Sequence, residues 1–218
     1  MKILLLGKRG QVGWELQRSL APLGEIVALS RDSQNHCGDL TNLQGLAETV
    51  QQIKPNIIVN AAAYTAVDKA ESEPKLAQMI NTGAPAILGR EAESLGAWLI
   101  HYSTDYVFDG GRTAPWLETD ATGPLGIYGA TKLAGEQAIQ ESGCNHLIFR
   151  TSWVYGARGN NFATTMLRLA TERNSLTVID DQVGAPTGAD LLADATAHTI
   201  RSVQSQPELG GLYHLAAG

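Results

Sequence analysis

The amino-terminal glycines constrain this chain more than any other feature of its sequence. Gly7, Gly10 and Gly13 stand directly after the apolar run Ile3–Leu6 and at the start of Val12–Leu23, where apolar residues recur four positions apart. Such glycines permit a tight turn, a close approach of the backbone to a pyrophosphate, and close packing of helix on strand. The helix amino terminus then faces the anion. The array therefore predicts a dinucleotide site, with an ordinary strand-to-helix turn as the alternative.

Short apolar runs recur along the chain and alternate with helix-patterned segments. The runs are Ile3–Leu6, Ile26–Leu29, Ile57–Val59, Trp98–Tyr102 and Leu147–Phe149. Their hydrophobicity is continuous rather than alternating, as expected of parallel strands that helices cover on both faces. We therefore expect an α/β fold with a doubly wound, Rossmann-like parallel sheet.

Charge and composition exclude several classes of protein. The 218 residues carry a net charge of −6, and the 16 basic residues are scattered, so no nucleic-acid partner is expected. No apolar stretch approaches the roughly 20 residues that span a bilayer, so no membrane partner is expected either. Cys37 and Cys144 lack metal-ligand spacing and predict free thiols in a reducing compartment, the cytoplasm. The histidines also lack ligand spacing and predict packing or surface positions: His36, His101, His146, His198 and His214.

The end of the second expected strand indicates which dinucleotide is bound. Ser30 and Arg31 stand where an NAD enzyme often has an acidic residue against the ribose hydroxyls. Arg31 could pair with a 2′-phosphate and Ser30 could donate a further hydrogen bond. We therefore expect NADPH to bind better than NADH, although Asp32 weakens this inference.

Two further strand ends are candidates for contact with the nucleotide. Asp39 and Leu40 are expected to follow a short third strand and to bracket the adenine, with a simple turn aspartate as the alternative. The segment Asn60–Thr65 follows the next strand, and its small side chains would let a flat nucleotide lie against the backbone. Its candidate cofactor contacts are Ala62, Ala63, Tyr64 and Thr65.

A tyrosine and a lysine four residues apart supply the candidate chemistry. Tyr128 and Lys132 share one face of an expected helix, and Thr104 ends the Trp98–Tyr102 strand region. A neighbouring ammonium should lower the pKa of the Tyr128 phenol. Hydride from NADPH would reach a carbonyl carbon while Tyr128 protonates the oxygen and Thr104 hydrogen-bonds to it. Such pairs are common on surface helices, but this one follows a nucleotide fingerprint.

These features suggest a division of the chain near Arg150. We expect residues 1–153 to form the NADP(H)-binding domain with the catalytic Tyr/Lys helix. Residues 154–218 are expected to be a mixed region that begins a smaller, incomplete substrate lobe and adds elements to the main domain. It contains expected helices near Phe162–Glu172 and Ala189–Arg201, and a last strand and loop over Leu212–Gly218.

The order and content of the motifs resemble the extended short-chain dehydrogenase/reductase superfamily and, more narrowly, the bacterial dTDP-4-dehydrorhamnose reductases. The motifs that carry the resemblance are Gly7–Leu16, Asn60–Glu71, Tyr102–Phe108, Tyr128–Glu136, Arg150–Tyr155 and Asp181–Thr187. The resemblance implies reduction of the 4-keto group of dTDP-4-dehydro-6-deoxy-L-mannose to dTDP-L-rhamnose with NADPH, a step toward O antigen and other surface polysaccharide.

The resemblance also assigns residues by matching motif. It implies that Tyr128 is the acid/base, that Lys132 binds the nicotinamide ribose, and that Thr104, Asp105 and Trp153 contact substrate. The matched cofactor positions are Gly10, Gln11, Val12, Ser30, Asp39, Leu40, Ala63, Tyr64, Thr65 and Tyr102. Family members often carry an acidic residue in place of Ser30, so the use of NADH as a weaker second cofactor is in doubt.

Several alternatives remain open at the level of sequence. Another sugar-nucleotide reductase or an epimerase could use the same Tyr and Lys, and an NADP-binding fragment or regulatory subunit would use no chemistry at all. Family members continue past the position of Gly218, which implies a missing part of the substrate lobe. Metal-linked dimers in the family leave open a homodimer with Mg²⁺ near Asp190, although a solvated aspartate at a helix start is the simpler interpretation.

Overall fold

A six-stranded parallel sheet forms the centre of the molecule, and the computed structural model describes residues 1–217 of it. The strand order is β2-β1-β3-β4-β5-β8, and every neighbouring pair is parallel. The strands are β1 Lys2–Leu6, β2 Glu25–Leu29, β3 Ile57–Asn60, β4 Trp98–Thr104, β5 Asn145–Thr151 and β8 Gly211–His214. The order reverses between β1 and β3, where ligands of such sheets bind beyond the strand carboxyl ends. The expected doubly wound α/β fold is confirmed.

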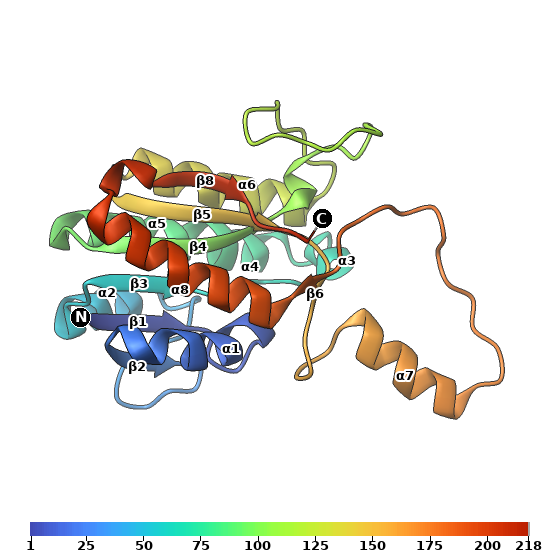
Figure 1. The fold of residues 1–218 in the computed structure, drawn as a ribbon, viewed down its shortest axis with the longest axis horizontal. Helices are drawn as coiled ribbons and strands as arrows, with labels where there is room; N and C mark the ends of the chain where they lie inside the picture. Colours follow the sequence, from blue (N-terminus) through green and yellow to red (C-terminus); the bar gives the residue numbers. More distant parts are fainter. Residues whose placement is uncertain (218) are drawn as a thin grey trace.

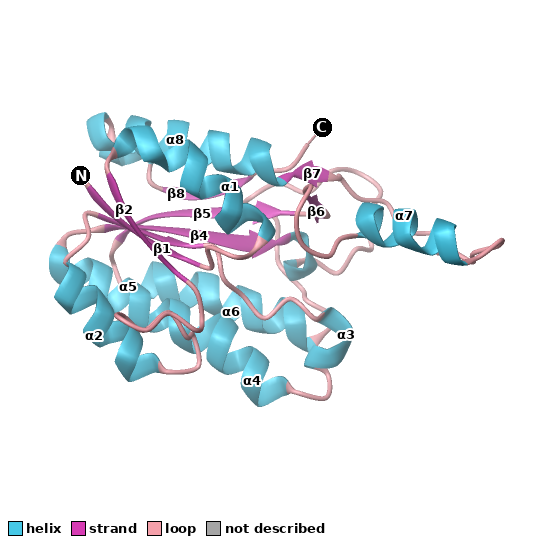
Figure 2. Cartoon of the chain, turned by 90° about the horizontal axis from the view of Figure 1, so that it is seen from below, coloured by secondary structure: helices cyan, strands magenta, loops and turns pink. Residues whose placement is uncertain are grey.

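Helices cover both faces of this sheet (Figure 2). One face carries α1 Gln11–Leu20 and α8 Ala189–Ser205, and the other carries α2 Leu43–Ile53, α5 Ala84–Leu95 and α6 Ile127–Glu141. Shorter pieces complete the chain: the helices α3 Val67–Ala70 and α4 Pro74–Gln78, the π-helix η2 Met79–Gly83, and the 3₁₀ turns η1 Ala21–Leu23, η3 Asp105–Val107 and η4 Pro207–Leu209.

Two hydrophobic cores lie on the two faces of the sheet. Leu4, Leu6 and Ile58 pack with α2 and α5, whereas Ile3 and Leu5 pack with α1 and α8. Successive side chains of a strand point to opposite faces, so both sets must be apolar. This requirement explains the continuous apolar runs of the sequence.

The expected strand before Asp39 is wrong. Within the described residues, the chain from β2 to α2 forms turns and bends rather than a strand. β2 is the edge strand, and the Cys37 amide donates to the Thr49 hydroxyl of α2 (2.8 Å). Because the Thr49 hydroxyl accepts from the Cys37 amide, the segment packs on a helix and does not extend the sheet.

Part of the carboxyl-terminal region stands away from the sheet (Figure 1). The pair β6 Val154–Tyr155 and β7 Thr187–Gly188 forms a second, two-stranded sheet, and α7 Phe162–Glu172 lies between them in sequence. The helix α7 buries none of its residues, whereas α8 and β8 return to the main sheet. The division of function at residue 153 remains a prediction.

Within residues 1–217, no helix has both the length and the apolar character needed to cross a membrane.

Candidate active site

The glycine turn after β1 has the backbone geometry that its sequence predicts. Gly7 has φ +89°, a region that favours glycine, and a Cβ there would lie 2.8 Å from the Ala61 carbonyl carbon. A Cβ on Gly13 would lie 2.0 Å from the Gly7 oxygen, so only glycine lets α1 pack this closely. In the described chain no side chain caps the first turn of α1, which begins after Gly10. Its first N–H groups are therefore suited to an anion.

The residues at the end of β2 form a small charged cluster. Ser30 is buried and donates to Asp32 (2.9 Å), and Arg9 pairs with Asp32 at 2.7 Å. Asp32 is therefore matched by a cation. Arg31 is 81% exposed and its guanidinium lies 3.4 Å from the Asp39 carboxylate. An exposed pair of this kind contributes about 0–1 kcal/mol, so a phosphate could readily replace it.

The two residues expected to bracket adenine differ in their surroundings. The Asp39 carboxylate accepts hydrogen bonds from the Thr41 amide and hydroxyl, at 2.9 and 2.8 Å, as in a turn. The Leu40 side chain is buried in the core with Leu29 and Leu46, which leaves 6% of it exposed. The simple turn interpretation therefore describes the local geometry, and Leu40 serves the core.

The segment after β3 is held by a residue that the sequence did not single out. Asn81 of the π-helix η2 accepts from the Tyr64 amide (2.9 Å) and donates to the Tyr64 carbonyl (3.1 Å). It also donates to the Thr131 hydroxyl of α6 (3.3 Å). The Tyr64 hydroxyl donates to Glu73 (2.7 Å). Asn81 therefore joins the segment after β3, at Tyr64, to the helix that carries Tyr128.

Tyr128, Thr104 and Asp105 meet where β4 ends and α6 begins. The Thr104 hydroxyl donates to Asp105 (3.0 Å) and accepts from the Tyr106 amide (3.2 Å). The Tyr106 ring meets the Tyr128 ring edge-on, with centroids 5.6 Å apart. Burial raises the pKa of Tyr128 to about 12, against the opposing effect of the Thr104 hydroxyl. Burial also raises the pKa of Asp105. Tyr128 is thus protonated at neutral pH.

The expectation that Lys132 lowers the Tyr128 pKa is wrong for this structure. Lys132 is 2% exposed, and its ammonium donates to the Tyr102 carbonyl at 2.6 Å. Burial lowers the Lys132 pKa to about 8, although Glu136 opposes the shift. The desolvation of the phenol exceeds any help from a lysine that is itself desolvated.

Five other candidates lie on α1, on β4 and in the segments that follow β3 and β5. The Tyr102 ring is buried beneath α8, where its hydroxyl shares a hydrogen bond of 2.6 Å with Thr196. Gln11 reaches the segment before α7, because it donates to the Val154 carbonyl (3.3 Å) and accepts from Asn161 (2.8 Å). Trp153 is half-exposed, has φ +42°, and lies against Gly184. Val12 is half-buried on α1, and Thr65 is exposed after β3.

The Mg²⁺ alternative is not supported. Among residues 1–217, no three His, Cys, Asp or Glu side chains gather as a metal site would require. The Asp190 carboxylate accepts from the Leu191 amide (2.9 Å), as is usual for an acidic residue in the first turn of a helix.

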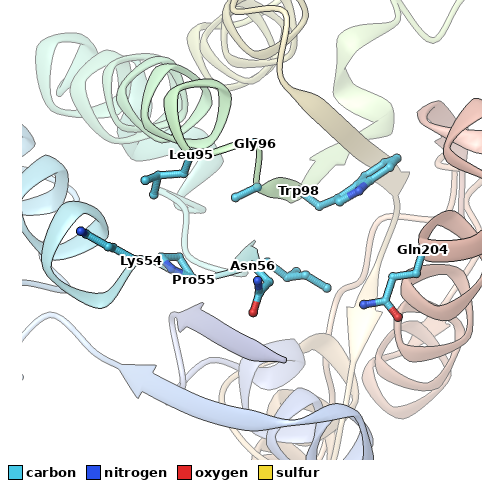
Figure 3. A pocket seen from close by; sticks show the side chains of 9 residues that line it. Lys54, Pro55, Asn56, Leu95, Gly96, Trp98 and Gln204 are labelled. Atoms are coloured by element: carbon cyan, nitrogen blue, oxygen red, sulfur yellow. The ribbon is translucent and has the colours of Figure 1, made fainter.

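Two hollows lie on the surface, one at the amino ends of the strands and one beside α1. One of about 420 Å³ lies at the amino ends of β3 and β4 and is lined by Lys54, Asn56, Trp98 and Gln204, among others (Figure 3). This edge is remote from the strand ends that carry Thr104. The other, of about 400 Å³, lies beside the glycine turn and includes Gln11 in its lining.

Known proteins resemble this chain along its whole length. Residues 1–218 match the family model described as RmlD substrate binding domain. Proteins named dTDP-4-dehydrorhamnose reductase from Shigella flexneri and Escherichia coli (strain K12) are each 64% identical, over 218 and 217 residues that make up 100% of this chain and 73% of each relative. A dTDP-4-dehydrorhamnose reductase structure from Bacillus anthracis str. Ames, in complex with NADP, has a TM-score of 0.89 at 38% identity and covers 100% of this chain and 74% of its own. The chain therefore belongs to the RmlD family of dTDP-4-dehydrorhamnose reductases.

Proposed function

We propose that this protein reduces the 4-keto group of dTDP-4-dehydro-6-deoxy-L-mannose with NADPH and so forms dTDP-L-rhamnose. The observation that carries the proposal is a protonated, half-buried Tyr128 beside Thr104, at the carboxyl end of the strands, where the glycine turn also lies. The names of relatives that are 64% identical support the same reaction. In bacteria this product supplies rhamnose for O antigen and other surface polysaccharides.

The residues around the glycine turn fit a dinucleotide phosphate. The uncapped first turn of α1 suits the pyrophosphate, and the backbone at Gly7 and Gly13 leaves no room for a side chain. The exposed Arg31 suits a 2′-phosphate, and the pairing of Asp32 with Arg9 reduces the repulsion that Asp32 would cause. These features favour NADPH over NADH.

The protein groups handle the proton and the carbonyl oxygen. NADPH, when bound, supplies hydride to the carbonyl carbon. Tyr128 donates its phenolic proton to the oxygen on which negative charge develops, and Thr104 stabilises that oxygen by a hydrogen bond. The high Tyr128 pKa keeps the phenol protonated until negative charge develops on the substrate oxygen. Asp105, which accepts from Thr104, and the exposed Trp153, which follows β5, are the proposed sugar contacts.

The proposed setting of the reaction is the cytoplasm. Cys37 and Cys144 are both free, as is usual in a reducing compartment.

The direct test supplies dTDP-4-dehydro-L-rhamnose and NADPH and follows NADPH oxidation by absorbance. It uses this chain and a version extended beyond Gly218, with NADPH affinity titrated separately for each. Turnover in both supports the reductase function, and turnover in the extended version alone assigns substrate closure to the added segment. NADPH binding without turnover in either would overturn the proposal in favour of another sugar nucleotide, an epimerase or a non-catalytic role.

A further inference from the structure

A buried polar chain runs from β3 through β4 to the catalytic helix. Asn60 Nδ2 lies 3.2 Å from His101 Nδ1, and His101 Nε2 lies 3.3 Å from Lys132 Nζ. Asn60 and His101 are each 1% exposed, and Lys132 is 2% exposed. The sheet register sets Asn60 directly beside His101. The sequence interpretation of His101 as a packing or surface residue therefore misses two polar contacts.

The backbone fixes the direction of the first hydrogen bond. The Ala62 amide donates to Asn60 Oδ1 (3.3 Å), so the oxygen of this side-chain amide is already directed toward the backbone. The Asn60 NH₂ group therefore faces His101 and donates to Nδ1. A neutral imidazole has one accepting and one donating nitrogen. His101 must then carry its proton on Nε2.

That proton faces the lysine. Lys132 Nζ also donates to the Tyr102 carbonyl (2.6 Å). An ammonium can only donate, whereas an uncharged amine keeps one lone pair that accepts. An Nε2–H beside Nζ therefore complements the amine and opposes the ammonium. Burial, and then the Lys132 charge, lower the His101 pKa well below its usual value, which keeps the imidazole neutral.

The other groups around Lys132 do not supply this effect. On α6 itself, Tyr128 lies one turn earlier and is protonated, and Glu136 lies one turn later and raises the Lys132 pKa. Glu136 is in turn bound by Arg150 of β5 (2.7 Å). From η2 the facing side chain is the uncharged Asn81, which bonds to Thr131.

We propose that His101 is a positioning residue for the reduction: Asn60 fixes its tautomer, and the resulting Nε2–H holds the Lys132 amino group against the Tyr102 carbonyl and favours the uncharged amine. The catalytic consequence rests on the proposed function. If the ammonium form of Lys132 supports turnover, the Asn60–His101 pair sets the pH at which turnover declines on the alkaline side.

The substitution Asn60→Asp tests the tautomer with little change of shape. One carboxylate oxygen can still accept from the Ala62 amide, but the other can only accept from His101. The imidazole must then move its proton to Nδ1, which leaves Nε2 to accept from the Lys132 ammonium. We expect the Lys132 pKa to rise by about one unit or more, since the ammonium gains an acceptor.

Long-range ¹H–¹⁵N correlation spectra of the full chain read the tautomer directly. The His101 signal is assigned by its loss in His101→Gln. We expect an Nε2–H tautomer near neutral pH in the parent and an Nδ1–H tautomer in Asn60→Asp. An Nδ1–H tautomer or an imidazolium in the parent would overturn the proposal. The spectrum of the parent needs only the assignment control and no substrate. Its result therefore holds even if the proposed reductase function is wrong.

A titration of the Lys132 ¹³Cε signal then separates the imidazole from a simple charge effect. Asn60→Asp is compared with the parent, both in the native background and with His101→Leu present. We expect the rise in the Lys132 pKa to shrink at least severalfold in the His101→Leu background, and the alkaline limb of kcat/KM to follow the Lys132 pKa. An equal rise in both backgrounds would show that the new carboxylate acts through its field alone, and would contradict a role for His101.

Discussion

At the scale of single residues, the site combines an acid that holds its proton with a lysine whose pKa is lowered by burial. Burial raises the Tyr128 pKa from 10.0 to about 12 and lowers the Lys132 pKa from 10.5 to about 8, so desolvation moves the two values apart. Each group is stabilised in its uncharged form. Transfer of a proton from the Lys132 ammonium to a Tyr128 phenolate is nearly neutral at the ordinary pKa values and becomes favourable at the shifted ones.

Removal of the Tyr128 hydroxyl should separate chemistry from binding. We expect Tyr128→Phe to lower kcat by at least 100-fold, because proton donation typically contributes 10²–10⁴-fold, about the range seen for general acids. The Kd for NADPH should stay within about threefold of the parent, a difference below 1 kcal/mol. Tyr213→Phe is the control, since within the described residues the Tyr213 hydroxyl donates to the Leu209 carbonyl alone. Unchanged turnover in Tyr128→Phe would contradict the assignment of the acid.

Arg31 should set the preference between the two nicotinamide cofactors. Its guanidinium is exposed and is paired only by a weak contact with Asp39, so Arg31→Ala should cost little stability. We expect the Kd for NADPH to rise roughly tenfold or more, and the Kd for NADH to change far less, because only NADPH carries the 2′-phosphate. Fluorescence titration measures both constants, with the remote Arg90→Ala on α5 as the control. An equal rise in Kd for the two cofactors would show that Arg31 does not bind the 2′-phosphate.

At the scale of elements, the contact of α1 with β1 determines the shape of the nucleotide site. A Cβ on Gly13 would lie 2.0 Å from the Gly7 oxygen, so Gly13→Ala must move the helix away from the turn. We expect a loss of about 1–3 kcal/mol in the free energy of unfolding, as for overpacking, together with weaker NADPH binding. Gly123→Ala is the matched control, because its Cβ would meet only Asp109 at 3.8 Å. Urea unfolding and NADPH titration of both variants would decide, and two equal stabilities would contradict the packing argument.

The elements also show which features a sequence can predict. The strands and α7 were predictable because buried runs and helical periodicity are local, and the glycine turn was predictable because its spacing reflects backbone geometry. The false strand before Asp39 arose because a short segment bonds to Thr49 of α2, which local pattern does not encode. Asn81 and His101 could not be assigned, because their roles depend on partners 17 to 50 positions away in the chain.

At the scale of the whole molecule, Arg150, Glu136 and Lys132 place ionisable groups in the interior around α6. Arg150 and Glu136 form a bidentate pair in which their side chains are 6% and 1% exposed, and Arg150 also lies 5.1 Å from the Phe108 ring centroid. Breaking such a pair leaves an unpaired buried charge and is strongly destabilising. Lys132 differs, because its ammonium donates to the Tyr102 carbonyl but forms no direct ion pair among the described residues. Its charge should therefore lower the free energy of unfolding.

Global stability should rise with pH on account of Lys132. Its pKa falls from an ordinary 10.5 to about 8 on folding, so between these values the unfolded chain binds more protons than the folded chain. Lys132 therefore lowers the free energy of unfolding at pH values below its folded pKa. This loss disappears as pH rises toward the unfolded pKa. Burial of the ammonium costs roughly 3 kcal/mol near neutral pH, and most of this cost disappears by about pH 10.

The substitution Lys132→Met isolates this effect, because it removes the titration and keeps an unbranched side chain. We expect the free energy of unfolding of the parent, minus that of Lys132→Met, to increase by about 2 kcal/mol between neutral pH and about pH 10. The lost hydrogen bond to the Tyr102 carbonyl shifts this difference by a constant and leaves its slope unchanged. Urea unfolding at the two pH values measures it, with the exposed Lys75→Met of α4 as a control that should show no such slope. If the two variants behave alike, Lys132 is charged in the folded protein over the whole range, and the proposed action of His101 on its amino group has no energetic basis.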